Sequence, residues 1–341
     1  MTTVPDVRGA VMLAEIAEQP AMFARNVHEL PPAIREVASF ISGAKPRFVL
    51  LAARGTSDHA ALYAKYLIEI RLGLPVGLAS PSTMTQYGAR PDLHDVLLVA
   101  VSQSGGSPDL VETLTTARAC GAMTLAVTNA PTSALATAAA LHIDVHAGPE
   151  LAVAATKSYT AELLALWLLV DAWYGGDAAA AGDLADAAAR TLIATTPIDD
   201  LVGRLSGVER IVVTGRGYSF PSALETALKL METSYVSAQA FSGADLMHGP
   251  MAMLQENSAV LAFVNGGVGG RAMHPVLDRL RELDTELTVI GEGDLALPTI
   301  DESLSPLLEI LPMQLLAHRL AVARGYDPDR PRGLLKVTQT T

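Results

Sequence analysis

The chain has 341 residues, half of them hydrophobic and 18% charged, which is typical of a globular protein with enough apolar material for two domains. The formal net charge of −12 argues against nucleic acid as a partner, because phosphate backbones are bound by clustered Lys and Arg. A single cysteine, Cys120, excludes a disulfide framework and a thiolate metal site within one chain.

The first part of the chain is expected to be a helical segment followed by a parallel sheet. Apolar residues at helical spacing over 9–42 predict helix. After Pro46, apolar runs predict strands, and helices are expected after the first two of them and over 161–174. Near-continuous apolar strands that alternate with helices are typical of a parallel sheet covered on both faces. The expected strands are 47–53, 95–102, 123–129 and 141–148.

The same pattern then restarts, which predicts a duplication. Residues 210–232 line up with residues 47–69, and Ser57 falls on Ser219. The second and third strands of the second copy are expected at 258–267 and 286–291. We therefore expect an α/β fold of two tandem domains, each a mainly parallel, flavodoxin-like sheet flanked by helices. The expected boundaries are an N-terminal helical segment 1–45, a first domain 46–175, a linker or surface helix 176–197, and a second domain 198–341 with a C-terminal tail.

No apolar run approaches the roughly 18 residues that a membrane span needs. The first twenty residues lack the charged start and apolar core of a secretory signal. We therefore expect a cytoplasmic protein with no membrane partner.

A loop of hydroxyls and glycines follows the expected strand 95–102 and reads Ser-Gln-Ser-Gly-Gly-Ser-Pro over 102–108. Ligands of open parallel sheets bind at the carboxyl ends of strands, where helix N-termini offer N–H groups to a phosphate. Gly105 and Gly106 permit close approach of the backbone. Because the loop lacks the Gly-Lys-Ser/Thr ending of a nucleotide-binding loop, the expected ligand is a monophosphate. A capped turn without a ligand is the alternative.

A second hydroxyl turn, 54–57, supports the phosphate interpretation because it also lies between a strand and a helix. Its counterpart in the second copy keeps Ser219 but has Tyr218 in place of Thr56. The sequence therefore predicts one phosphate site per chain, in the first domain. The candidate residues are Gly55, Thr56, Ser57, Ser102, Gln103, Ser104 and Ser107.

These motifs resemble the sugar isomerase (SIS) domain family, and the whole chain resembles the isomerase half of glucosamine-6-phosphate synthase. The nearest resemblance is to stand-alone double-SIS enzymes of the glucosamine-6-phosphate deaminase and ketosamine deglycase type. The matching blocks are EIAEQP (15–20), RGTSDHAAL (54–62), VSQSGGSPD (101–109), GPELAVAATKSYT (148–160), the stretch 215–241, LMHGPMAML (246–254) and the stretch 311–340.

Three departures from the synthase affect the expected chemistry. The chain begins Met-Thr-Thr and shows no glutaminase domain with an N-terminal Cys nucleophile, so no glutaminase activity is expected. Arg54 stands where the synthase has a smaller residue, and Gly106 where it has an acidic one. Both of these substitutions affect the expected substrate preference.

Moving a proton between C1 and C2 of a sugar phosphate needs a carboxylate, and the second copy offers one on a helix. Glu225, Lys229 and Glu232 fall at helical spacing on one face. From spacing alone, a solvated stripe of charges is the alternative. The resemblance implies that Glu232 transfers the proton and that Lys229 supports it.

Two further candidates rest on the resemblance. His248 lies in a Gly- and Pro-rich loop and matches the residue that opens the sugar ring, which in the family comes from the neighbouring subunit. Lys336, in the C-terminal tail, matches a lysine that lies over the sugar and can form a Schiff base. The alternatives are a structural histidine and a solvated tail lysine. Val153, Ala155 and Thr156 match the loop that walls the sugar, and Lys157 is expected only to anchor that loop.

The strand 141–148 also places His142, Asp144 and His146 on one face if it alternates regularly. A polar strand face is the preferred interpretation, and neither a metal nor another cofactor is expected.

The function expected from these residues is isomerisation or deamination of an amino-sugar 6-phosphate, giving fructose 6-phosphate and ammonia from glucosamine 6-phosphate. A deglycase of a 6-phosphorylated fructosamine and a non-catalytic sugar-phosphate sensor are the alternatives. The resemblance implies a homodimer with shared active sites.

Overall fold

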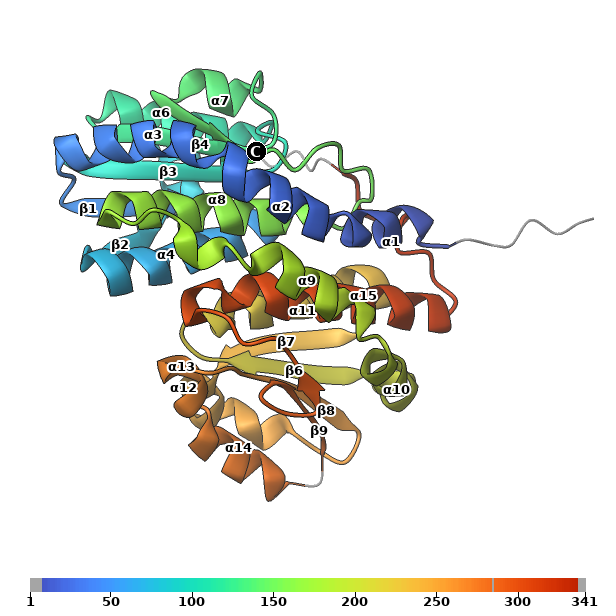
Figure 1. The fold of residues 1–341 in the computed structure, drawn as a ribbon. Coiled ribbons are helices and arrows are strands. Elements are labelled where there is room, and N and C mark those ends of the chain that lie inside the picture. The colour runs from blue at the N-terminus through green and yellow to red at the C-terminus, as the bar shows by residue number, and fades with distance from the viewer. Residues whose placement is uncertain (1–7, 284, 337–341) are drawn as a thin grey trace, which may run out of the picture. The chain divides into compact units, whose positions relative to one another are not determined.

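The computed structural model describes residues 8–283 and 285–336, and it contains two compact units, each built on a five-stranded parallel sheet (Figure 1). The first-sheet unit comprises residues 20–149 and 157–185. The second-sheet unit comprises the described residues 8–19, the segment Glu150–Thr156 and the segment Asp186–Lys336. The two helix-flanked parallel sheets confirm the expected pair of tandem α/β domains.

In the first sheet, the strands lie in the order β2-β1-β3-β4-β5, and all neighbouring strands are parallel. The central strands are almost wholly buried, as their apolar sequences predict. The strands are β1 (Phe48–Ala52), β2 (Val76–Leu78), β3 (Val96–Ser102), β4 (Met123–Thr128) and β5 (Leu141–Asp144).

Two groups of helices pack on this sheet. Leu98 and Ala100 of β3 belong to a core cluster with Leu110 and Leu114 of α6 (Pro108–Ala119). A second group consists of α3 (Pro31–Ala44), α4 (Thr56–Leu72) and α8 (Lys157–Tyr174), which pack against one another and against the strands. The other helices of this part of the chain are α2 (Gln19–Glu29), α5 (Pro81–Thr85), α7 (Ala134–Ala138) and the 3₁₀ helix η1 (Ala179–Ala181).

The second sheet repeats the strand order of the first when each is numbered from its own start, since its order is β10-β9-β8-β6-β7. Every neighbouring pair is parallel. This repetition is the structural counterpart of the duplication predicted from the sequence. The strands are β6 (Arg210–Gly215), β7 (Ser237–Ser242), β8 (Ser258–Val264), β9 (Glu286–Gly291) and β10 (Leu295–Ala296).

Helices also flank the second sheet. Val260 and Ala262 of β8 share a core cluster with Leu246 of α12 (Gly243–Met247) and Leu277 of α14 (His274–Arg281). The helices α11 (Ser219–Ser234) and α15 (Ser305–Ala323) pack closely against each other. The others are α1 (Ala10–Ala17), α9 (Leu184–Ile193), which begins in the first-sheet unit, α10 (Thr196–Leu205), α13 (Val268–Arg271), η2 (Pro250–Met253) and η3 (Glu302–Leu304).

Three edge strands, β2, β7 and β10, were missed by the sequence analysis. The strand at 258–264 is the third of its copy along the chain and not the second, because β7 precedes it, and β2 precedes β3 in the same way. β2 has three residues, and β7 reads Ser-Ala-Gln-Ala-Phe-Ser, with mostly small or polar side chains. Edge strands are half-solvated, so they lack the apolar run that marks a central strand.

No helix in the described part of the chain is long and apolar enough to cross a membrane. The stretch 176–197, expected as a linker or surface helix, contains η1, α9 and the start of α10. The expected domain boundaries stay a prediction.

Candidate active site

The two predicted phosphate turns are neighbours in the first-sheet unit. β1 and β3 pair in parallel, with Ala52 opposite Ala100, so the loops that follow them leave the sheet at the same edge. The loop after β3 leads into α6, and the turn after β1 leads into α4. Two helices of 12 and 17 residues therefore begin beside each other at the carboxyl ends of adjacent strands. Ligands of open α/β sheets bind at this edge.

Two backbone N–H groups in the loop after β3 donate hydrogen bonds to serine hydroxyls of the same loop. The N–H of Gly105 donates to Oγ of Ser102 at 3.2 Å, and the N–H of Gly106 donates to Oγ of Ser104 at 3.3 Å. Both hydroxyls act as acceptors within the loop, so each keeps its proton for an outside acceptor. Gly105 has φ of +59°, and a Cβ there would lie 2.1 Å from Oγ of Ser133. Only glycine fits this position.

Ser107 is the N-cap of α6, and Pro108 is its first residue. Within the described chain, the Ser107 side chain accepts no capping hydrogen bond from its own helix. Its hydroxyl is half-buried at a helix start, where a partial positive charge favours an anion. The carbonyl of Gln103 accepts a hydrogen bond from the N–H of Asn129 at 3.1 Å, which ties the loop to the end of β4.

The turn after β1 uses its two hydroxyl residues differently from what the sequence suggests. Gly55 is the N-cap of α4 and has φ of +55°. Ser57 is buried, and its Oγ donates to Oε1 of Glu162 at 2.9 Å. A hydroxyl has one proton, so in this arrangement the Ser57 side chain has none to donate to a phosphate. What the turn offers an anion is the set of N–H groups in the first turn of α4.

The corresponding loops of the second copy are filled by acidic side chains of the same unit. Glu302 accepts hydrogen bonds from the N–H groups of Val268 and Gly269 at 3.0 and 2.7 Å, in the loop after β8. Ser219 donates to buried Glu309 at 2.6 Å. Burial raises the pKa of Glu309, although hydrogen bonds from Ser219 and other donors oppose the shift. The Ser219–Glu309 pair thus repeats the Ser57–Glu162 pair of the first copy, whereas Glu302 accepts N–H groups only in the second copy.

The predicted sugar wall and Lys336 come together in the second-sheet unit. Nζ of Lys336 donates to Oε2 of Glu150 at 2.9 Å and to the carbonyl of Ala152 at 2.6 Å. The other oxygen of Glu150 accepts the N–H of Thr156 at 2.9 Å. Glu15 of α1 accepts the N–H groups of Leu151 and Ala152. The segment 150–156, which includes Val153 and Ala155, is therefore held by buried carboxylates.

The three charged residues of α11 are a buried ion-pair cluster and not a solvated stripe. Lys229 is wholly buried, with Nζ 3.3 Å from Oε1 of Glu225 and 2.5 Å from Oε2 of Glu232. Burial alone would lower the pKa of Lys229, but the carboxylates of Glu225 and Glu232 outweigh it and raise the pKa above its ordinary value. Glu225 is also wholly buried, whereas 22% of the Glu232 side chain is exposed. Glu232 is therefore the carboxylate of the cluster that a ligand can reach.

His248 is exposed at the C-cap of the short helix α12. Its backbone N–H donates to the carbonyl of Asp245 at 3.0 Å. In the part of the chain that the structure describes, no hydrogen bond or ion pair joins His248 to Glu232 or to Lys336. The structure thus leaves the imidazole on the surface. Lys157, by contrast, is buried at the start of α8.

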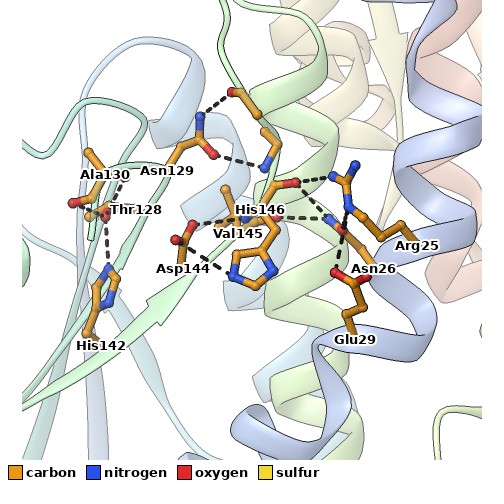
Figure 2. Close-up of polar contacts among 12 residues, drawn as sticks. Arg25, Asn26, Glu29, Thr128, Asn129, Ala130, His142, Asp144, Val145 and His146 are labelled. Atoms are coloured by element: carbon orange, nitrogen blue, oxygen red, sulfur yellow. Dashed lines mark hydrogen bonds and ion pairs between the residues drawn. The ribbon is translucent and has the colours of Figure 1, made fainter. Parts of the chain in front are cut away.

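The strand histidines have separate partners, as Figure 2 shows. His142 shares a hydrogen bond of 2.9 Å with Oγ1 of Thr128. β5 ends at Asp144, and His146 lies beyond it with φ of +50°, its ring 3.8 Å from the Asp144 carboxylate. Regular alternation therefore stops before His146. Across residues 8–283 and 285–336, no group of three or more His, Cys, Asp or Glu side chains could hold a metal ion.

Sequence reasoning missed the buried acids that organise these loops. Glu150 and Glu15 lie inside the quoted blocks but were given no role, and neither was Glu162. The available signal was an acidic residue within an otherwise apolar or small-residue run. That pattern does not reveal the partner, which is supplied by a distant segment.

These features agree with comparisons to known proteins. The family model of the SIS domain matches residues 43–172 and 204–290, one segment for each sheet. The chain therefore belongs to the SIS domain family, and it carries two copies of the domain.

Within that family, the chain is related to the isomerase half of glutamine–fructose-6-phosphate aminotransferase. The enzyme of that name from Thermococcus kodakarensis is 33% identical over 349 residues, which cover 95% of this chain and 57% of the relative. The chain thus spans less than two thirds of the length of such curated relatives.

Two solved structures also match most of this chain. A protein of Silicibacter pomeroyi assigned as a phosphosugar isomerase is 34% identical, with a TM-score of 0.86, and the match covers 93% of this chain and 99% of that one. The C-terminal domain of glucosamine-fructose-6-phosphate aminotransferase from Francisella tularensis is 25% identical, with a TM-score of 0.84, covering 96% and 100%.

Proposed function

We propose that this chain is a phosphosugar isomerase that converts glucosamine 6-phosphate and water into fructose 6-phosphate and ammonia. The observation that carries the proposal is the cluster on α11, in which buried Lys229 holds the partly exposed carboxylate of Glu232. A carboxylate fixed by a buried cation suits a reaction that needs one base to move a proton between adjacent carbons. The names of the relatives supply the substrate class, a phosphorylated ketose or aldose.

In the proposed reaction, His248 helps to open the sugar ring and Glu232 removes the proton from C2 of the open-chain amino aldose. The electrons of the C2–H bond form the C1–C2 double bond, and the aldehyde oxygen takes up a proton. Glu232 then delivers its proton to C1, while the amine loses one, which gives an imine at C2. Water adds to C2, and the C–N bond breaks to release ammonia. The two carbons exchange one proton through one carboxylate, as general acid–base catalysis requires.

The phosphate is proposed to bind the turns after β1 and β3, through Gly55, Thr56 and the N–H of Ser57 and through Ser102, Gln103, Ser104 and Ser107. Support comes from the unused hydroxyl protons of Ser102 and Ser104 and from the uncapped Ser107. The second copy is proposed to bind none, because Glu302 already accepts the N–H groups of its loop. Val153, Ala155 and Thr156 are proposed to wall the sugar.

Lys336 is proposed to hold the open chain of the sugar. In the structure its ammonium is engaged by Glu150 and by the carbonyl of Ala152. An ammonium has no lone pair, so a Schiff base with the ketose would first need Lys336 to give up a proton. The contact with Glu150 therefore supports a role as a positive charge more directly than one as a nucleophile.

The substrate proposal is tested by measuring ammonia release from the purified full chain. We expect release from glucosamine 6-phosphate, with fructose 6-phosphate formed in equal amount, and none from unphosphorylated glucosamine. If the chain instead cleaves a 6-phosphorylated fructosamine, the deglycase reaction replaces this one, since the same C1–C2 proton transfer serves both. If the chain binds sugar phosphates but converts neither glucosamine 6-phosphate nor a 6-phosphorylated fructosamine, it would be a sensor. That result would refute the enzyme proposal.

The proposal includes a homodimer in which His248 completes the site of the partner subunit. The exposed imidazole of His248, which shares no hydrogen bond or ion pair with Glu232 or Lys336 in the described chain, supports this arrangement. We expect that mixing inactive His248→Ala and Glu232→Gln chains under conditions of subunit exchange restores part of the activity. One of the two mixed sites would then carry both intact residues. Absence of rescue, with exchange shown by mass spectrometry of tagged chains, would refute the shared site.

A further inference from the structure

An arginine links the two turns that are proposed to bind the phosphate. Arg54 ends the loop after β1, immediately before Gly55, and Asp109 lies in the first turn of α6. Nε and Nη2 of Arg54 each lie 2.8 Å from Oδ2 of Asp109. Oδ1 of Asp109 accepts the N–H of Leu110 at 2.9 Å. The ion pair thus fixes the guanidinium between the start of α4 and the start of α6.

The exposure of the two partners is unequal, and this inequality points to a second role for Arg54. The Asp109 side chain is 3% exposed, whereas the Arg54 side chain is 45% exposed. A guanidinium has five N–H donors, and the contacts to Asp109 use the edge formed by Nε and Nη2. Nη1 takes no part in the contacts to Asp109, and Asp58 lies near enough for the Arg54 guanidinium to oppose the rise that burial causes in the Asp58 pKa. Two parallel N–H groups on one edge match two oxygens of a phosphate.

The second copy provides an internal comparison. Arg216 occupies the position of Arg54, and its side chain is exposed. The loop facing it in that copy is already satisfied by Glu302, whose oxygens accept the N–H groups of Val268 and Gly269. No ion pair is found for Arg216 among the residues that the structure describes. Arg54 is therefore anchored to the helix that follows the facing loop, whereas the facing loop of the second copy is held by Glu302 and not by Arg216.

We infer that Arg54 is a substrate-binding residue whose Nη1–Nη2 edge binds the sugar phosphate. Asp109 is the positioning residue that orients the Arg54 guanidinium. The inference rests on the proposed function, because it assumes that the phosphate occupies the turns after β1 and β3. It adds a charged contact to a site otherwise built from hydroxyls and backbone N–H groups. Arg54 thereby selects a phosphorylated sugar over the same sugar without its phosphate.

The test measures binding of fructose 6-phosphate and of fructose to the full chain by calorimetry. Arg54→Gln should weaken fructose 6-phosphate binding by about 10- to 100-fold, the range for hydrogen bonds to a charged group. The weak binding of fructose should not change. Arg216→Gln is the matched control and should leave both affinities as they are. Arg54→Lys keeps the charge but loses the fork, so it should bind with intermediate affinity.

Two reference variants separate the inference from the proposed function. Ser104→Ala removes a hydroxyl of the proposed phosphate loop and should weaken fructose 6-phosphate binding. If Ser104→Ala weakens it and Arg54→Gln does not, the phosphate loop stands and the role of Arg54 is refuted. If wild type binds fructose 6-phosphate no better than fructose, the proposed function itself fails. If Arg54→Gln does not fold, as judged by its melting temperature without ligand, Arg54→Lys is compared with wild type instead. An affinity of Arg54→Lys for fructose 6-phosphate equal to that of wild type would then refute the role of Arg54.

Discussion

Replacing Glu232 with glutamine is expected to lower turnover of glucosamine 6-phosphate by about 10²–10⁴-fold, the usual contribution of a general base. The substitution keeps the size of the side chain and can still accept the hydrogen bond from Lys229, so the fold should be retained. Binding of fructose 6-phosphate should change little, because its phosphate is proposed to contact a different set of residues. The measurement is kcat from ammonia release, with the dissociation constant measured separately.

The control for this variant is Glu256→Gln, the same chemical change at an exposed glutamate of the second-sheet unit. It should have wild-type kcat. A Glu232→Gln protein that keeps full kcat would remove the base from the proposed mechanism. Weaker binding with kcat unchanged would show that Glu232 stabilises the ground state and the transition state equally.

Much of the fold could be predicted because its central strands carry their own signal. β3 and β4 are buried on both faces, so their sequences are apolar almost throughout, and each is followed by a helix. The duplication was equally visible, since Arg54-Gly55 and Arg216-Gly217 stand at the same place in two similar stretches. The edge strands β2 and β7 carry no such signal, because a half-solvated strand has no need of a continuous apolar run.

The candidate site was only partly visible for a different reason. The hydroxyl loops are local, so their residues and the start of α6 could be read directly from the sequence. The state of a polar side chain depends on its partner, and the partner is often distant in sequence. Ser57 looked like a phosphate ligand, yet its hydroxyl proton is donated to Glu162, 105 residues away. A solvated tail lysine was the alternative interpretation of Lys336, yet its ammonium is paired with Glu150.

The charged residues of α11 also show that a sequence does not reveal how deeply a polar side chain is buried. Spacing of i and i+4 is compatible with a surface pair, and only the burial of Lys229 and Glu225 distinguishes the two cases. Lys65 and Glu69 of α4 have the same spacing but remain partly exposed, at 27% and 36%. The two pairs share their spacing, with the acid and the base in opposite order, and they differ mainly in burial, so they offer a test of what burial does to an ion pair.

Lys229→Met is accordingly expected to lower the free energy of unfolding by about 3–5 kcal/mol at neutral pH, the cost of leaving buried charges without their partner. Methionine fills most of the space of the lysine stem, so the loss reports the charge and not a cavity. Lys65→Met removes the exposed counterpart and should cost less than about 1 kcal/mol. Both values come from urea unfolding of the purified chain, followed by circular dichroism.

The loss in Lys229→Met is expected because Glu225 is then a buried charge without its partner. The double variant Lys229→Met, Glu225→Gln should recover part of the lost stability at pH 7, since it removes the orphaned charge. Equal losses in Lys229→Met and Lys65→Met would mean that water reaches the α11 cluster. Glu232 would then lack the buried cation on which its proposed role as the base depends.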